Sequence, residues 1–109
     1  MARFIHPNLR DVPLESVLHA LSDPTRLEIV RRLNADLAAK AEGLACNCAA
    51  PEDLPRATMS NHFNLLRSAG LIESRKRGTM VINSLRRADL DARFPGLLDA
   101  VLAVEPASS

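Results

Sequence analysis

Aromatic side chains are scarce in this sequence. Tryptophan and tyrosine are absent, and phenylalanine occurs three times among 109 residues. Hydrophobic residues nevertheless make up 47% of the chain, which is enough to form a core. Because that core must consist mainly of leucine, isoleucine, valine and alanine, we expect helices packed on helices within one compact domain.

Long apolar runs and cysteines are also few. No stretch approaches the roughly 18 apolar residues that span a membrane, and the first residues, MARFIHPNLRD, lack the apolar segment of a signal peptide. We therefore expect a cytoplasmic protein without a membrane partner. In that reducing compartment the two cysteines, Cys46 and Cys48, are expected to be thiols rather than a structural disulfide.

The formal net charge of +1 conceals a strong asymmetry. Residues 56–87 contain seven basic side chains and a single acid, Glu73, whereas the remainder of the chain has an excess of acids. One strongly basic third in a nearly neutral protein is typical of a nucleic-acid-binding surface.

The stretch RATMSNHFNLLRSAG, residues 56–70, has the spacing of an amphipathic helix. Its apolar residues follow one another at intervals of four, three and three, which places them on one face. Asparagine and arginine can read base edges, and serine and threonine reach bases or phosphates. An ordinary surface helix that lacks acids is the alternative. The opposite face is polar or basic throughout, with Arg56, Thr58, Ser60, Asn61, Asn64 and Arg67.

Further helices are predicted on both sides of this stretch. A short helix from Pro13 to Leu21 precedes a second one that begins at Ser22, with Asp23 as its cap and Pro24 in its first turn. The second helix can continue to Ala41. Apolar spacing also predicts helices over 88–94 and 97–105, separated by a Pro-Gly break.

The segments beside the central helix complete a recognisable order. Residues 44–50 are predicted as a short helical turn, and LIESR and TMVINSL, after Gly70, have the alternation of strands. Between these strands, Arg75, Lys76, Arg77 and Gly78 are predicted to form a tight basic turn. This order predicts a mainly α fold with a β-hairpin wing: an arm over 1–12, a winged helix-turn-helix domain over 13–105, and a frayed tail over 106–109.

These segments resemble the ArsR/SmtB family of winged-helix transcriptional repressors. LSDPTRLEIVRRL is similar to that family's second helix, TMSNHFNLLRSAGLI to its recognition helix, and RKRGTMVINSL to its wing. The resemblance implies a homodimer formed by the first and last helices, which binds an operator palindrome and is released by an effector. It also implies DNA contacts from Arg56, Thr58, Ser60, Asn61, His62, Arg67, Arg75, Lys76 and Arg77. For His62, packing within its own domain is an equal alternative.

The effector is harder to assign. Many family members bind metal through aspartate, histidine and glutamate on the last helix, but histidine is absent from that region here, so no such site is expected. Cys46-Asn47-Cys48 resembles a second family pattern, in which thiolates bind arsenite, antimonite or a soft metal ion. Two thiols per chain leave a third ligand to come from elsewhere, such as His6 of a partner's arm, solvent or an added thiol.

Two alternatives for the thiols stay open. Cys46 and Cys48 precede a basic region, and thiolates near positive charge oxidise readily, so they could sense oxidants or other reactive species. Cys48 could instead be a small buried side chain without a sensing role. No cofactor is otherwise required by the sequence.

Two other functional classes compete with a DNA-binding repressor. A winged-helix module could use its basic face to bind an acidic protein. A small thiol enzyme is the other, but the sequence lacks a Cys-x-x-Cys motif and any apparent Ser-His-Asp set, so no catalytic activity is expected.

Overall fold

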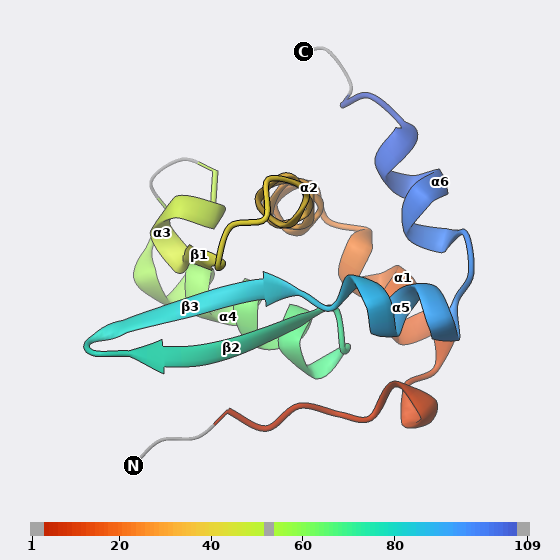
Figure 1. The fold of residues 1–109 in the computed structure, drawn as a ribbon. Coiled ribbons are helices and arrows are strands. Elements are labelled where there is room, and N and C mark those ends of the chain that lie inside the picture. Colours follow the sequence, from red (N-terminus) through yellow and green to blue (C-terminus); the bar gives the residue numbers. More distant parts are fainter. Residues whose placement is uncertain (1–3, 52–53, 107–109) are drawn as a thin grey trace.

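The computed structural model describes residues 4–51 and 54–106. Within them, short helices surround a small antiparallel sheet whose last two strands in chain order project as a hairpin (Figure 1). In chain order the elements are η1 Leu9–Asp11, α1 Leu14–Leu21, α2 Pro24–Ala38, β1 Leu44–Ala45, α3 Cys46–Ala49, α4 Arg56–Ser68, β2 Ile72–Arg77, β3 Met80–Leu85, α5 Arg87–Arg93 and α6 Leu97–Ala103.

The predicted helices are present with small changes at their ends. Asp23 caps α2 through a 3.1 Å bond from the Arg26 amide, and Pro24 occupies the first turn as expected. The helix ends at Ala38 rather than Ala41, because Lys40 adopts a left-handed conformation with φ of 58°. Pro95 and Gly96 separate α5 from α6, as the sequence predicted.

The sheet departs from the prediction in two places. Leu44 and Ala45 were expected in a helical turn, but they form β1 and pair with Asn83 and Ile82 of β3, giving the strand order β1-β3-β2. The helical turn is thus shorter, Cys46–Ala49. The predicted turn at residues 75–78 is also wrong, because residues 75–77 continue β2 and only Gly78 and Thr79 turn the chain.

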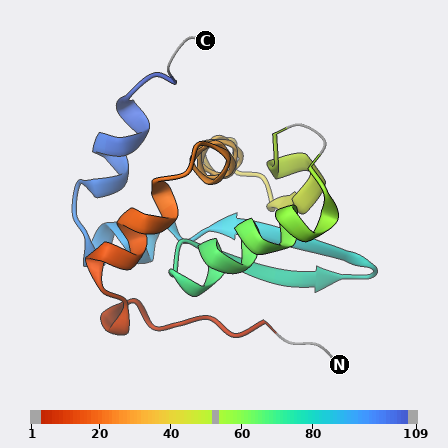
Figure 2. The ribbon, with the colours of Figure 1, turned by 180° about the vertical axis from the view of Figure 1, so that it is seen from behind.

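The core lies where α2 and α4 meet the sheet. Seen from behind, α4 crosses the β2–β3 hairpin (Figure 2). Phe63 and Leu66 on the inner face of α4 are almost fully buried, as are Ile29 and Leu33 of α2. The predicted apolar stripe of the central helix is therefore its packing face, which leaves the opposite face to solvent.

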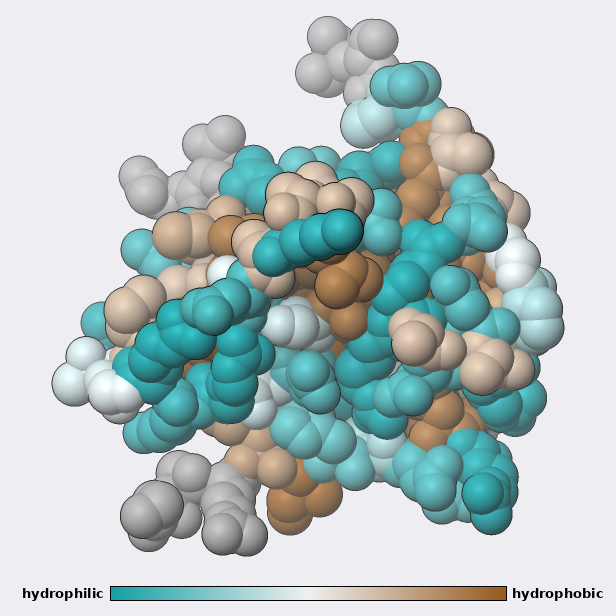
Figure 3. All heavy atoms as spheres, in the orientation of Figure 1, coloured by the Kyte–Doolittle hydropathy of each residue, from teal (hydrophilic) through white to brown (hydrophobic). Residues whose placement is uncertain are grey.

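The terminal helix lies at the edge of the domain. Leu98 is the buried residue of α6, and Arg31 of α2 donates a 2.9 Å hydrogen bond to the Val104 carbonyl at its end. Figure 3 shows apolar side chains along α6 and hydrophilic ones over the hairpin. Most of the predicted tail, residues 107–109, lies outside the described part. None of the described helices is long and apolar enough to cross a membrane.

Candidate nucleic-acid interface

The outward face of α4 is a continuous polar surface. Arg56, Thr58, Ser60 and Asn61 are all exposed, while Met59, Phe63 and Leu66 face the protein. The first turn contains no acid, and Pro55 at the cap position provides no side-chain hydrogen bond to the helix. The positive end of the helix dipole therefore coincides with Arg56, which favours an anion at this end.

The hairpin formed by β2 and β3 carries the second basic group. Arg75, Lys76 and Arg77 are exposed on β2 and pair in register with Ile82, Val81 and Met80 of β3. Because these residues are in a strand, their side chains alternate between its two faces rather than clustering at a turn. The turn itself uses Gly78 with φ of 63°, the left-handed conformation that was predicted there.

An acidic residue that the sequence did not suggest lies against this hairpin. Glu42, in the connection before β1, pairs with Arg77 at 3.1 Å, and its backbone carbonyl accepts a hydrogen bond from Arg75. Both members of the ion pair are largely exposed, so it is worth about 0–1 kcal/mol. Polyanion binding at Arg77 would have to exchange this weak pair for a phosphate contact.

His62 lies on the side of α4 that faces the start of α2. Its Nδ1 is 3.3 Å from a guanidinium nitrogen of Arg26 and 4.0 Å from the Asp23 carboxylate. The ring is half-buried, which is the geometry expected for its packing alternative. A DNA contact from His62 stays a prediction.

Arg67 is half-buried and is held against the protein by its own-chain partners. Its Nε donates a 2.9 Å bond to Ser74 Oγ, another nitrogen donates to Asn64 Oδ1 at 2.8 Å, and the guanidinium lies 4.4 Å from the centre of the Phe4 ring. Burial lowers the pKa of the Arg67 guanidinium, and an electrostatic interaction with Cys46 opposes that effect. The predicted phosphate contact would require Arg67 to leave these partners.

Two further basic residues of the segment 56–87 have structural roles. Arg86 donates to the Pro7 carbonyl at 2.8 Å and pairs with Asp89, whereas Arg87 bonds Asn34, Asp91 and Asp99. Hydrogen bonding to Asp91 is the main cause of the raised pKa of Arg87. The charge count along the sequence therefore overstates the basic surface, because it includes arginines neutralised by α5 and α6.

The two cysteines have different surroundings. Cys48 is exposed, whereas Cys46 is half-buried and its sulfur accepts a 3.3 Å hydrogen bond from Nδ2 of the fully buried Asn83. Asn83 also accepts from Ser74 Oγ at 2.7 Å. Among the described residues, no group of three or more histidine, cysteine, aspartate or glutamate side chains is arranged to hold a metal ion.

Asn83 and Ser74 form a buried polar link that sequence reasoning missed. Through them the Cys46 sulfur connects to Arg67 of α4 by hydrogen bonds of 3.3, 2.7 and 2.9 Å. In the sequence both residues stand in alternating strands, where a polar residue is ordinarily exposed. The signal that could have revealed this link is the pairing register of the two strands, because it makes Asn83 and Ser74 direct cross-strand partners.

The arm reaches the same link from outside. The Ser74 amide donates a 2.9 Å bond to Nε2 of His6, so that nitrogen must be unprotonated. Burial lowers the pKa of His6, Arg86 and Arg67 add to the decrease, and Glu73 opposes it. His6, which was considered as a third metal ligand for a partner, is engaged within its own chain.

Comparisons with known proteins agree with this geometry. The family model for a helix-turn-helix domain matches residues 21–75. YceK of Bacillus subtilis, an uncharacterized HTH-type transcriptional regulator, is 34% identical over 88 residues, which cover 78% of this chain and 82% of that protein. MJ1325 of Methanocaldococcus jannaschii, described in the same words, is 37% identical over 65 residues. That match covers 58% of this chain and 66% of MJ1325, just under two thirds of its length.

Solved structures share the fold. An ArsR-like transcriptional regulator from Rhodococcus sp. RHA1 is 32% identical with a TM-score of 0.57, covering 80% of this chain and 77% of that one. The transcriptional repressor BigR from Xylella fastidiosa has a TM-score of 0.60 at 21% identity, covering 87% and 88% of the two chains. At that identity the second likeness concerns the fold alone.

Proposed function

This chain belongs to the ArsR/SmtB family of winged helix-turn-helix transcriptional regulators, which are not enzymes, and from that premise we propose that it is a dimeric repressor of its own operator. The exposed, acid-free face of α4 carries the proposal. In a major groove, Arg56 and Asn61 would read base edges, with Thr58 and Ser60 reaching bases or phosphates. Arg75, Lys76 and Arg77 of the hairpin would contact the neighbouring backbone.

The proposed dimer uses α1 and α6. Leu14 and Leu18 of α1 are 44% and 45% exposed, which is high for leucines on an amphipathic helix. On α6, Val101 and Leu102 are only half-buried. A twofold axis through these helices would place two copies of α4 on half-sites about one DNA turn apart, so the operator would be an imperfect palindrome.

Release is proposed to depend on the thiols Cys46 and Cys48. Arsenite, antimonite or a soft metal ion is the proposed effector, with oxidation of the thiols as the alternative. The buried link through Asn83 and Ser74 supports a sensing role for Cys46, because a change at its sulfur would disturb hydrogen bonds that position Arg67 on α4.

Operator binding is tested by fluorescence anisotropy on promoter duplexes. Arg56→Ala and Asn61→Ala are each expected to cost about 1–3 kcal/mol of binding free energy and to reduce selectivity over random DNA. Arg10→Ala is the matched control, since Arg10 is exposed on η1, at the end of the molecule opposite the hairpin turn (Figure 1). Equal affinities for the parent and all three variants would contradict the assignment of α4 as the helix that reads the operator.

The thiol proposal is tested with the same duplex. Arsenite, cadmium, lead and hydrogen peroxide are titrated against the parent–operator complex and against Cys46→Ser and Cys48→Ser complexes. We expect the Cys46→Ser protein to lose its response while retaining operator affinity. A parent and two variants that respond alike would remove the thiols from the mechanism.

A further inference from the structure

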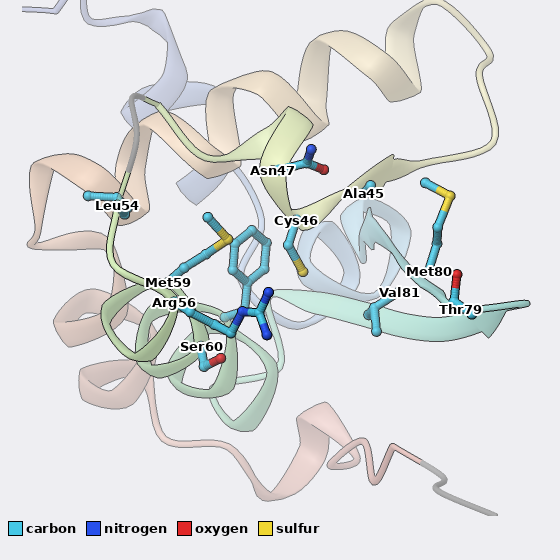
Figure 4. A pocket seen from close by; sticks show the side chains of 11 residues that line it. Ala45, Cys46, Asn47, Leu54, Arg56, Met59, Ser60, Thr79, Met80 and Val81 are labelled. Carbon is cyan, nitrogen blue, oxygen red and sulfur yellow. The ribbon is translucent and has the colours of Figure 1, made fainter.

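A cavity opens between α3, the first turns of α4 and the start of β3. Its volume is about 670 Å³, within the range of sites that take small organic molecules. Figure 4 shows the side chains around it, with the Cys46 sulfur and the Met59 side chain on its walls and Arg56 at the start of α4.

The walls of this cavity combine an apolar body with one positive charge. Leu54, Met59, Phe63 and Val81 supply apolar surface from the loop, α4 and β3. Arg56 is the sole cation of the described lining, and no carboxylate belongs to it. An apolar pocket with a guanidinium at one edge is complementary to a carboxylate attached to a hydrocarbon or aromatic body.

We propose that this cavity binds a small organic monoanion with an apolar body of roughly six to ten carbon atoms. The carboxylate lies on Arg56 and the first turn of α4, and the body packs against Met59 and Val81. This ligand is a second input, distinct from chemistry at Cys46 and Cys48. Its effect on DNA rests on the proposed function, because Arg56 and Ser60 line the cavity and are also proposed operator contacts.

The methionines provide a direct probe of occupancy. The chain has three, and two of them, Met59 and Met80, line the cavity. Protein labelled with ¹³C at the methionine methyl groups is titrated by NMR with octanoate and, separately, with 1-octanol. Octanoate is expected to shift the Met59 and Met80 signals, with at least tenfold weaker binding of the alcohol.

The cysteines provide a second, chemical probe. Alkylation by iodoacetamide is followed at each thiol by mass spectrometry, with and without octanoate. Bound octanoate is expected to slow modification of Cys46, which lines the cavity, and to leave the exposed Cys48 unchanged. Similar rates with and without octanoate at Cys46 would contradict occupancy of the cavity.

Two variants separate the cavity from the DNA-binding surface. Val81→Phe fills the cavity at a half-buried position outside the proposed DNA contacts, and Leu37→Phe places the same ring at a 40% exposed site on α2. Val81→Phe is expected to lose octanoate binding and octanoate-induced operator release but to keep operator affinity, while Leu37→Phe keeps all three. If Val81→Phe does not fold, Arg56→Gln provides the test, since it should bind octanoate no better than 1-octanol.

The outcomes distinguish this proposal from the repressor proposal. Operator binding by the ligand-free parent tests the repressor proposal. The methionine-methyl titration tests the cavity proposal and needs no DNA. Unshifted Met59 and Met80 signals, or equal affinity for the alcohol, would overturn the ligand. Shifts produced by operator duplex but not by octanoate would assign the cavity to DNA alone and overturn it as well. Octanoate binding without operator release would overturn the proposal that octanoate and the operator compete for Arg56 and Ser60.

Discussion

Replacement of Asn83 by alanine should destabilise the domain strongly, although Asn83 is a polar residue in a short strand. The Asn83 side chain is fully buried, accepts from Ser74 Oγ at 2.7 Å and donates to the Leu44 carbonyl at 3.2 Å and to the Cys46 sulfur. Each hydrogen bond is worth about 1 kcal/mol, and each buried partner left unsatisfied costs about 1–3 kcal/mol. We therefore expect a loss of about 2–4 kcal/mol in the free energy of unfolding.

Urea denaturation followed by circular dichroism measures this loss, and thermal melting provides an independent check. A change of that size corresponds to a decrease in Tm of roughly 10–25 °C for a domain of this length. Asn47→Ala is the matched control, because Asn47 is exposed on α3; its effect should stay within about 0.5 kcal/mol.

A double-mutant cycle identifies the cause of the loss. If the Ser74–Asn83 bond is responsible, the combined Ser74→Ala and Asn83→Ala protein should be more stable than the sum of the single losses by about 1 kcal/mol. Strict additivity, or an Asn83→Ala protein as stable as the Asn47→Ala control, would refute the argument that this buried link holds β1, β2 and β3 together.

Two further predictions concern the arm. Gly70 has φ of 81°, and an added Cβ there would overlap a methyl group of buried Leu9. Gly70→Ala should therefore lower the free energy of unfolding in urea by about 2–4 kcal/mol, against about 1 kcal/mol for Gly78→Ala, where the space is open. Equal losses would show that the arm does not pack on Gly70. Because folding lowers the pKa of His6, its contribution to stability is complete above its unfolded pKa of about 6.5 and is lost as pH falls through the lower folded value. The urea midpoint should therefore decrease on acidification below about pH 6.5, and should decrease less in His6→Gln. Parallel pH profiles for the parent and His6→Gln would contradict the role of the hydrogen bond from the Ser74 amide.

The helices could be predicted because their signals are local. Asp23 and Pro24, which are adjacent in the sequence, mark the start of α2. The intervals between Met59, Phe63 and Leu66 mark the inward face of α4. The same local reasoning failed at Leu44, because a two-residue strand is determined by its partner Asn83, 39 residues away. Hydrophobic and polar alternation carries no information about such a pairing.

The candidate site was predictable in part, for a similar reason. Exposure of Arg56, Thr58, Ser60 and Asn61 follows from helical periodicity and agrees with the structure. The internal contacts of Arg67 with Phe4 and Ser74, and the position of Glu42 beside Arg77, depend on how the arm and the α2–β1 connection fold back on the hairpin. Residue type and charge count could not distinguish Arg67, which is engaged by the arm and β2, from the arginines that face solvent.

The most direct test of the DNA-binding account is the salt dependence of operator binding by the parent and by Lys76→Gln. In the proposed dimer, two hairpins and two α4 helices on one duplex would neutralise about six to eight phosphates, so log K should fall with log salt with a slope near −5 to −7. Removing Lys76 from both protomers should make that slope shallower by about 2. A parent that ignores duplex DNA at low ionic strength, or a slope that Lys76→Gln leaves unchanged, would contradict the assignment of the hairpin and α4 as the nucleic-acid surface.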